Sequence, residues 1–301
     1  MVKRFLSADA SEILEMNKEE LKQSIKASAG RIICSEVIGN MQPIIGDITN
    51  AEVAVSYGAD LILMNGFDCY APKINGLAQC DESQIIQQVR EYTGRPVGIN
   101  LEPLDDTADF LENRIEIPAG RACSVETLEL ADKLGLDFIC LTGNPGTGVT
   151  NKSIQQGIKL AKNHFSGMII AGKMHSAGVD EPVVSKEAIQ AFVEAGADVI
   201  LMPAVGSIPG FTDEELIEGV KYAKAHGALT MSAIGTSQES ADQETIKHIA
   251  LRNKIAGVDI QHIGDGGYAA GVATLENIYA MSVAIRGVRH TMSRVARSVK
   301  R

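Results

Sequence analysis

Lys173 ends one of the most apolar runs of the chain, GMIIAGK at 167–173, and His175 lies two residues further on. A cation and a base are costly to bury beside such residues unless they have a partner or a function. We expect the two side chains to share one face of an extended segment. Burial would disfavour the charged form of Lys173, which could act as a base, a Schiff-base nucleophile or a cation that stabilises an enolate. His175 could then move the proton.

Other apolar runs also end in polar residues that could contact a substrate. Asn100 and Glu102 lie two residues apart, so an extended chain would place them on one face. Glu36 and Glu102 could instead be structural acids, the asparagines could bond loop backbone, and His262 could be a core histidine. The predicted catalytic residues are Lys173, His175, Glu36 and Glu102, and the predicted substrate-binding residues are Asn65, Asn100, Thr142 and His262.

The elements that would position these residues are indicated by a repeat. Four stretches share a helix-like segment, a Gly, an Asp two residues later and an apolar run: 57–66, 134–143, 195–204 and 256–265. The Gly suits a helix end in the left-handed conformation. The run suits a strand buried on both faces of a parallel sheet. The repeated residues Asp60, Asp137, Asp198 and Asp259 would lie at strand starts, where we expect a structural role.

Four further strand-like runs, at 31–37, 96–102, 167–173 and 228–234, alternate with these, and helical segments separate them all. Eight strands alternating with eight helices predict an α/β fold, a single (β/α)8 TIM barrel. The alternative, a doubly wound sheet, usually carries a GxGxxG fingerprint, which is missing here. We expect residues 1–29 to form an N-terminal helical extension and residues 30–301 to form the barrel, including a basic C-terminal helix.

In a barrel of this kind the strand ends line one mouth, where active sites lie, and the loops after strands seven and eight often bind phosphate. Glycines let a backbone approach an anion closely, and hydroxyl groups can donate to it. The predicted phosphate-binding residues are Gly235, Thr236, Ser237, Gly264, Gly266 and Gly267. The two longest loops, 65–80 and 103–123, could each act as a lid.

The composition limits the possible partners. The net charge of −10 argues against a general nucleic-acid or membrane-surface binder. No apolar run approaches the roughly 20 residues needed to cross a bilayer. The five cysteines show no zinc spacing, which favours reduced thiols and a cytoplasmic protein. Residues 281–301 carry six Lys or Arg and no acid, and we expect this amphipathic helix to pack on the barrel of its own or a neighbouring subunit, in a homo-oligomer.

The alternating pattern over about residues 30–290 resembles the broad group of phosphate-binding (β/α)8-barrel enzymes, such as sugar-phosphate epimerases, aldolases and phosphoenolpyruvate-mutase-like lyases. The resemblance implies an isomerase, an epimerase or a carbon–carbon lyase of carbohydrate metabolism, acting on a small phosphorylated carbohydrate or carboxylate. Mg²⁺ held by Glu36, Glu102 or Asp68 is compatible with these acids, but no spacing requires a metal. The alternative is a non-catalytic barrel that binds a phosphorylated metabolite as a sensor or docking module.

Overall fold

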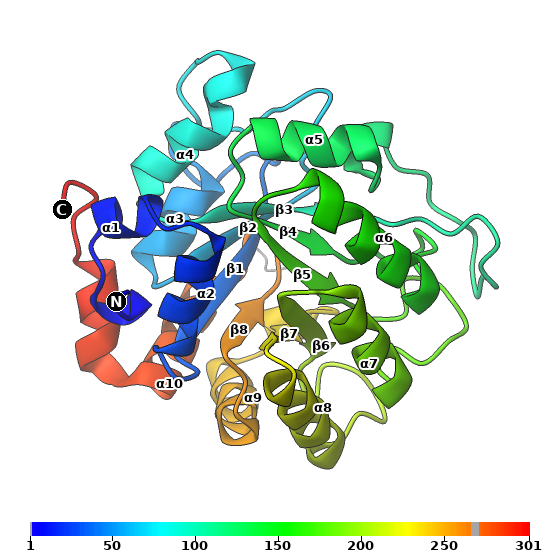
Figure 1. Ribbon diagram of the computed structural model, residues 1–301. Coiled ribbons are helices and arrows are strands. Elements are labelled where there is room, and N and C mark those ends of the chain that lie inside the picture. The colour runs from blue at the N-terminus through cyan, green and yellow to red at the C-terminus, as the bar shows by residue number, and fades with distance from the viewer. Residues whose placement is uncertain (1, 266–270) are drawn as a thin grey trace.

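The structure is a computed structural model that describes residues 2–265 and 271–301. Within these residues, eight parallel strands pair in chain order and close into a barrel, with β8 beside β1. Helices surround the strands (Figure 1). The predicted (β/α)8 barrel is therefore confirmed. The strands are β1 (Ile32–Ile38), β2 (Leu61–Asn65), β3 (Val97–Leu101), β4 (Phe138–Leu141), β5 (Met168–Gly172), β6 (Val199–Pro203), β7 (Leu229–Ile234) and β8 (Ile260–Ile263).

The helices between the strands begin at residues that suit helix starts. Thr49, Thr150 and Thr212 each accept a hydrogen bond from the backbone N–H three residues later. The chain leaves α7 and α9 at Gly196 and Gly257, which have positive φ as the repeat predicts. The helices are α3 (Asn50–Ser56), α4 (Ile85–Thr93), α5 (Val125–Lys133), α6 (Asn151–His164), α7 (Lys186–Ala195), α8 (Asp213–Ala225), α9 (Gln243–Ala256) and α10 (Leu275–Val295).

The four repeated aspartates are structural, as predicted. Each carboxylate accepts a hydrogen bond from a backbone N–H at the start of the preceding strand, at 2.8–3.1 Å. Each also has a basic partner, and together they brace the end of the barrel opposite the mouth. The partners are Arg286 and Arg294 for Asp60, Arg90 for Asp137, Lys18 and Lys22 for Asp198, and Lys224 for Asp259.

The N-terminal segment closes this same end. It contains a 3-10 helix (Phe5–Ser7) and the helices α1 (Ala10–Leu14) and α2 (Lys18–Lys26), and α2 begins with a capping box formed by Asn17 and Glu20. Side chains such as Phe5 and Ile25 pack with the inward-facing residues of the strands in one apolar cluster. Burial of this cluster fixes the extension against the barrel.

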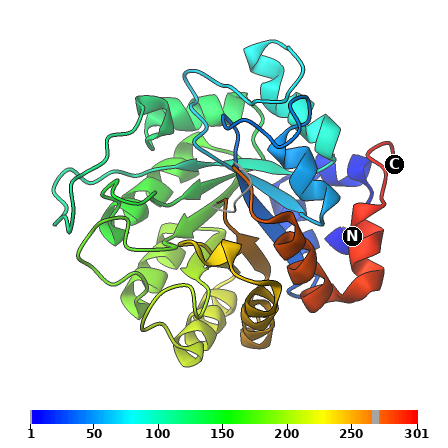
Figure 2. The same cartoon turned by 180° about the vertical axis from the view of Figure 1, so that it is seen from behind.

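The C-terminal helix differs from the single amphipathic helix that the sequence predicts. Gly287 has φ of 70° and ψ of 166°, which are not helical values, so the helix axis changes direction there. After this kink Val288 and Met292 are exposed, whereas Arg294 is buried against Asp60. Figures 1 and 2 show the final part of α10 beside the N-terminal helices of the same chain. Among the helices described, none is long and apolar enough to cross a membrane.

Candidate active site at the barrel mouth

A polar cavity of about 460 Å³ lies at the end of the barrel where the strands finish. Nine of the predicted site residues line it, drawn from strands one to five, seven and eight or the loops after them: Glu36, Asn65, Asn100, Thr142, His175, Gly235, Thr236, Ser237 and Gly264. The structure therefore brings together most of the residues that the sequence singles out. The cavity wall also includes five polar residues that the sequence analysis missed, namely Glu112, Asn144, Ser176, Glu239 and Asp265.

Glu36 lies at the base of this cavity and is 4% exposed. Its carboxylate accepts a hydrogen bond from Asn100 Nδ2 at 2.6 Å and faces His262 Nε2 at 2.9 Å. His262 is fully buried and does not line the cavity, and its predicted contact with substrate stays a prediction. Its position inside β8 explains why it does not line the cavity, because the side chain is directed at Glu36 on the neighbouring strand β1.

Asp265, just after β8, is the most perturbed acid on the wall. Burial raises its pKa to about 7, and the nearby charge of Glu36 adds to the effect. A hydrogen bond from Asn65 Nδ2, at 3.1 Å, opposes the shift. A carboxyl group with a pKa near neutrality can both accept and return a proton. The sequence shows this residue only as an acid between glycines, and its burial comes from the closed barrel.

Asn65, which donates a hydrogen bond to Asp265, is itself held by a chain of further hydrogen bonds. The side-chain amides of Asn65 and Asn144 bond each other reciprocally, at 2.9 and 3.1 Å. Glu102 accepts from both the backbone N–H and the Nδ2 of Asn144, and it forms an ion pair with Arg121 at 2.9 Å. Glu102 is 1% exposed, and Arg121 and Asn144 occupy its oxygens, so in this structure it holds Asn144 in position. Its predicted catalytic role stays a prediction.

His175 is held in one tautomer on the wall. The backbone N–H of Ala177 donates to Nδ1 at 3.0 Å, so the neutral ring carries its proton on Nε2. Burial lowers the pKa of His175, which favours the neutral form at pH 7. Ala177 itself has φ of 56°, a strained conformation for a residue with a side chain. The arrangement supplies an N–H donor without a positive charge.

Lys173 does not line the cavity, whereas His175 does, and the predicted catalytic role of Lys173 stays a prediction. Strand β5 ends at Gly172, and the two-residue alternation of a strand does not extend beyond it. Lys173 Nζ instead forms an ion pair with Glu181 Oε1 at 2.7 Å. Glu181 also accepts from the backbone N–H of Asn151, at the start of α6. Burial lowers the pKa of Lys173, as expected, and Glu181 opposes that shift.

The loop after β3 covers one side of the mouth and extends beyond the ring of helices (Figure 2). Its backbone pairs with the loops after β4 and β5, through Asp105 with Gly148 and Leu111 with Gly178. This pairing brings Glu112 to the cavity wall. Its predicted role as a lid stays a prediction.

The predicted phosphate site also stays a prediction. Gly235, Thr236, Ser237 and Gly264 line the cavity, but Gly266 and Gly267 lie outside the described residues. The Thr236 hydroxyl donates to backbone carbonyls of Ser207 and Gly235. The described wall carries four carboxyl groups, those of Glu36, Glu112, Glu239 and Asp265, and no Lys or Arg. This balance disfavours an anion.

The predicted Mg²⁺ option does not fit the residues described. No three His, Cys, Asp or Glu side chains among them come together in a way that could hold a metal. The oxygens of Glu36 and Glu102 are engaged by hydrogen-bond donors, and Asp68 accepts from the backbone N–H of Tyr70. We therefore derive no metal-dependent step.

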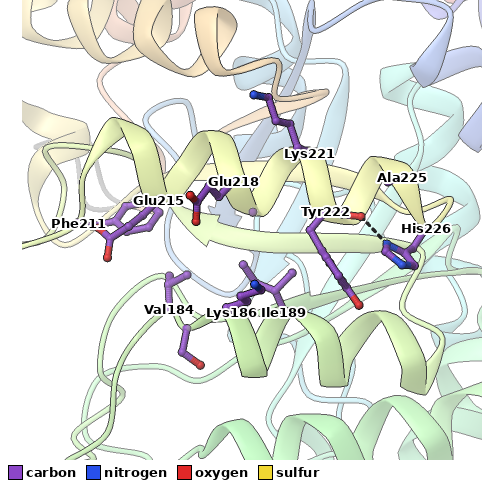
Figure 3. Close-up of a pocket in the computed structure, with 12 residues that line it drawn as sticks. Val184, Lys186, Ile189, Phe211, Glu215, Glu218, Lys221, Tyr222, Ala225 and His226 are labelled. Carbon is purple, nitrogen blue, oxygen red and sulfur yellow. Dashed lines mark hydrogen bonds between the residues drawn. The ribbon is translucent and has the colours of Figure 1, made fainter.

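A second cavity, of about 570 Å³, lies between α7 and α8 on the outside of the barrel (Figure 3). Ile189, Phe211 and Tyr222 contribute apolar surface, and Tyr222 stacks on His226 at a ring separation of 4.2 Å. None of the predicted site residues lines this groove. It is larger than the mouth cavity but lacks its buried polar network, so the mouth is the candidate active site.

Fold and cavity together define a TIM-barrel protein with an acidic, polar mouth. The chain belongs to the family described as "Domain of unknown function (DUF7916)", whose model matches residues 6–301. No curated protein matches the chain.

Solved structures show the same kind of barrel. A protein from Coccidioides immitis described as a candidate fructose-1,6-biphosphate aldolase is 12% identical, with a TM-score of 0.52 over 93% of this chain and 97% of that chain. The 2,3-dimethylmalate lyase, a member of the PEP mutase/isocitrate lyase superfamily, is 14% identical, with a TM-score of 0.49 over 81% and 80%. The predicted resemblance to this broad group of barrels is confirmed at the level of the fold, and fold alone does not define an activity.

Proposed function

We propose that this chain is an enzyme of the isomerase, epimerase or carbon–carbon lyase type that acts on a small carbonyl compound. The observation that carries this proposal is the partly buried carboxyl group of Asp265 on the wall of the mouth cavity, whose pKa is raised to about 7. Perturbed acids of this kind cluster at catalytic sites. A barrel mouth is also where such enzymes place their chemistry.

In this reaction Asp265 is the general base. Its carboxylate takes a proton from the carbon next to the carbonyl, and the electrons of the broken C–H bond move to the carbonyl oxygen to give an enolate. His175, neutral and protonated on Nε2, donates a hydrogen bond to that oxygen. For an isomer of an α-hydroxy carbonyl compound, the adjacent hydroxyl proton moves to the enolate oxygen and Asp265 delivers its proton to the former carbonyl carbon. For an epimer, a second acid protonates the original carbon from the opposite face while Asp265 keeps the proton that it removed. In the lyase version Asp265 removes a hydroxyl proton, and a carbon–carbon bond breaks to leave the same enolate.

A phosphorylated substrate is the less favoured version of this proposal. The four carboxyl groups of the wall would repel a phosphate, and the described wall offers no Lys or Arg. Among the described residues, the glycines and hydroxyl groups predicted to contact a phosphate are those at 235–237 and 264. The predicted homo-oligomer and cytoplasmic location stay predictions.

The proposal can be tested by hydrogen–deuterium exchange. The purified protein is incubated in D₂O with small aldehydes, ketones, keto acids and their aldol adducts, and the α C–H signals are followed by NMR. We expect the native protein to exchange at least one compound and Asp265→Asn to lose that exchange while folded. Glu218→Gln, an exposed change in the α7–α8 groove, is the control and should keep it. Exchange that survives in Asp265→Asn would contradict the proposal, and binding without any exchange would favour the sensor or docking role.

A further inference from the structure

Three residues on the mouth cavity, Asn100, Glu239 and Thr142, each have a buried side-chain oxygen that lacks a hydrogen-bond partner among the described residues. Asn100 is 4% exposed, and its Nδ2 donates to Glu36, which leaves Oδ1 unpaired. Glu239 is 3% exposed, and its Oε2 is also unpaired. Buried polar atoms without a partner are costly, so a ligand that supplies donors would remove that cost.

The charges around these atoms favour a positive ligand. Glu36 and Asp265 face the same cavity. Burial raises the pKa of Glu239, and the nearby charge of Glu36 adds to the effect. Lys173 is paired with Glu181, and burial favours the neutral form of His175. His262 opposes the raised pKa of Glu239, but it faces Glu36 and does not line the cavity.

We propose that the mouth cavity binds a substrate that carries a protonated primary amine, with Glu239 Oε2 and Asn100 Oδ1 accepting its hydrogens. An ammonium group has three donors and no acceptor, which suits a wall that offers unpaired acceptors. Its charge would also be stabilised by the carboxylates of this wall. This inference deepens the proposed function and rests on it for the reaction, because it makes the carbonyl substrate an amino sugar or an amino ketone.

A metal cation is the competing occupant of an acidic cavity. The described side chains form no group of three that could hold one. The Asn100 amide is also fixed by its bond to Glu36, so it presents a single acceptor rather than part of a ligand ring. An organic ammonium needs hydrogen-bond acceptors rather than a closed coordination shell, and it therefore suits the wall better.

The test uses three small probes of similar size: ethanolamine, which is cationic, ethylene glycol, which is neutral, and glycolate, which is anionic. Affinities are measured by saturation-transfer NMR titration at pH 7.5 and low salt, with inorganic phosphate as a further probe. We expect ethanolamine to bind about tenfold more tightly than ethylene glycol, the effect of one charge-assisted hydrogen bond. Glu239→Gln should remove most of this preference without changing the affinity for ethylene glycol. Glu218→Gln is the matched control and should keep it.

Tighter binding of glycolate or phosphate than of ethanolamine would overturn the inference, and so would an unchanged preference in folded Glu239→Gln. The two proposals fail separately. Exchange that depends on Asp265, without any preference for amines, would support the proposed reaction and contradict the amine-binding site. A preference for amines that depends on Glu239, with no exchange of any compound, would support the amine-binding site and contradict the proposed reaction.

Discussion

The carboxylate of Glu36 on β1 lies 2.9 Å from Nε2 of His262 on β8. The two strands are the first and last of the barrel, and they are neighbours only because the sheet closes. The pair is buried below the cavity. Closure of the barrel therefore fixes the acid whose charge acts on Asp265.

Glu36→Gln should lower the pKa of Asp265 below its native value of about 7. The nearby charge of Glu36 is the second cause of the raised pKa, after burial, and the amide keeps the size of the side chain. A ¹³C NMR titration of the Asp265 carboxyl group measures this. Glu112→Gln, at another position on the wall, is the control and should leave the pKa of Asp265 unchanged. An identical titration in Glu36→Gln and native protein would rule out the coupling.

Asp265→Asn should stabilise the protein, and more so at pH 8 than at pH 5. The pKa of Asp265 is about 7 in the folded state against an ordinary value of 3.8. The folded protein therefore binds this proton more tightly than the unfolded chain, so stability falls as pH rises from about 4 to about 7. The loss amounts to about 4 kcal/mol at pH 8. Urea unfolding at both pH values measures the difference, and a less stable variant at pH 8 would contradict it.

Lys173→Met should leave ligand affinity unchanged, because Lys173 is paired with Glu181 and lies off the cavity wall. A Schiff base is therefore not expected, and borohydride with an exchanging substrate should leave no added mass on the protein. Mass spectrometry checks this directly. A reduced adduct mapped to Lys173 would show that the ion pair opens during turnover.

Asp60→Asn should destabilise the protein by about 3–5 kcal/mol, the cost of removing one partner from a buried ion pair. Asp60 is fully buried and faces both Arg286 and Arg294. Asp213→Asn is a matched control, because Asp213 pairs with Arg252 at the surface, where solvent screens the charges, and its loss should destabilise the protein much less. Urea denaturation measures both. Equal decreases in the free energy of unfolding of the two variants would contradict the prediction that burial makes the Asp60 ion pairs more important for stability.

The barrel could be predicted from the sequence because its signals are local. The glycine, the aspartate and the apolar run recur with each pair of strands, and strand ends in a closed barrel must meet at one mouth. These local signals are enough to predict that Glu36, Asn100 and His175 lie at the mouth, where the structure has them.

The rest depended on distant contacts. Strand β5 ends at Gly172, directly before Lys173. Because Lys173 lies outside the strand, its side chain pairs with Glu181 instead of lining the cavity. The pKa of Asp265 depends on burial by other strands and on Glu36, more than 200 residues earlier in the chain. Glu239 lies in a short 3-10 helix (Gln238–Ser240), which is too short to show a periodic sequence pattern, so its place on the cavity wall could not be predicted.

The four aspartate braces at the closed end have one further consequence. They anchor every second strand start to the strand before it, on the side away from the cavity. Substitutions, insertions or deletions in the rim loops would leave these anchors intact. The molecule thus separates the residues that keep it folded from those free to diversify, and relatives with quite different ligands could share one unchanged base.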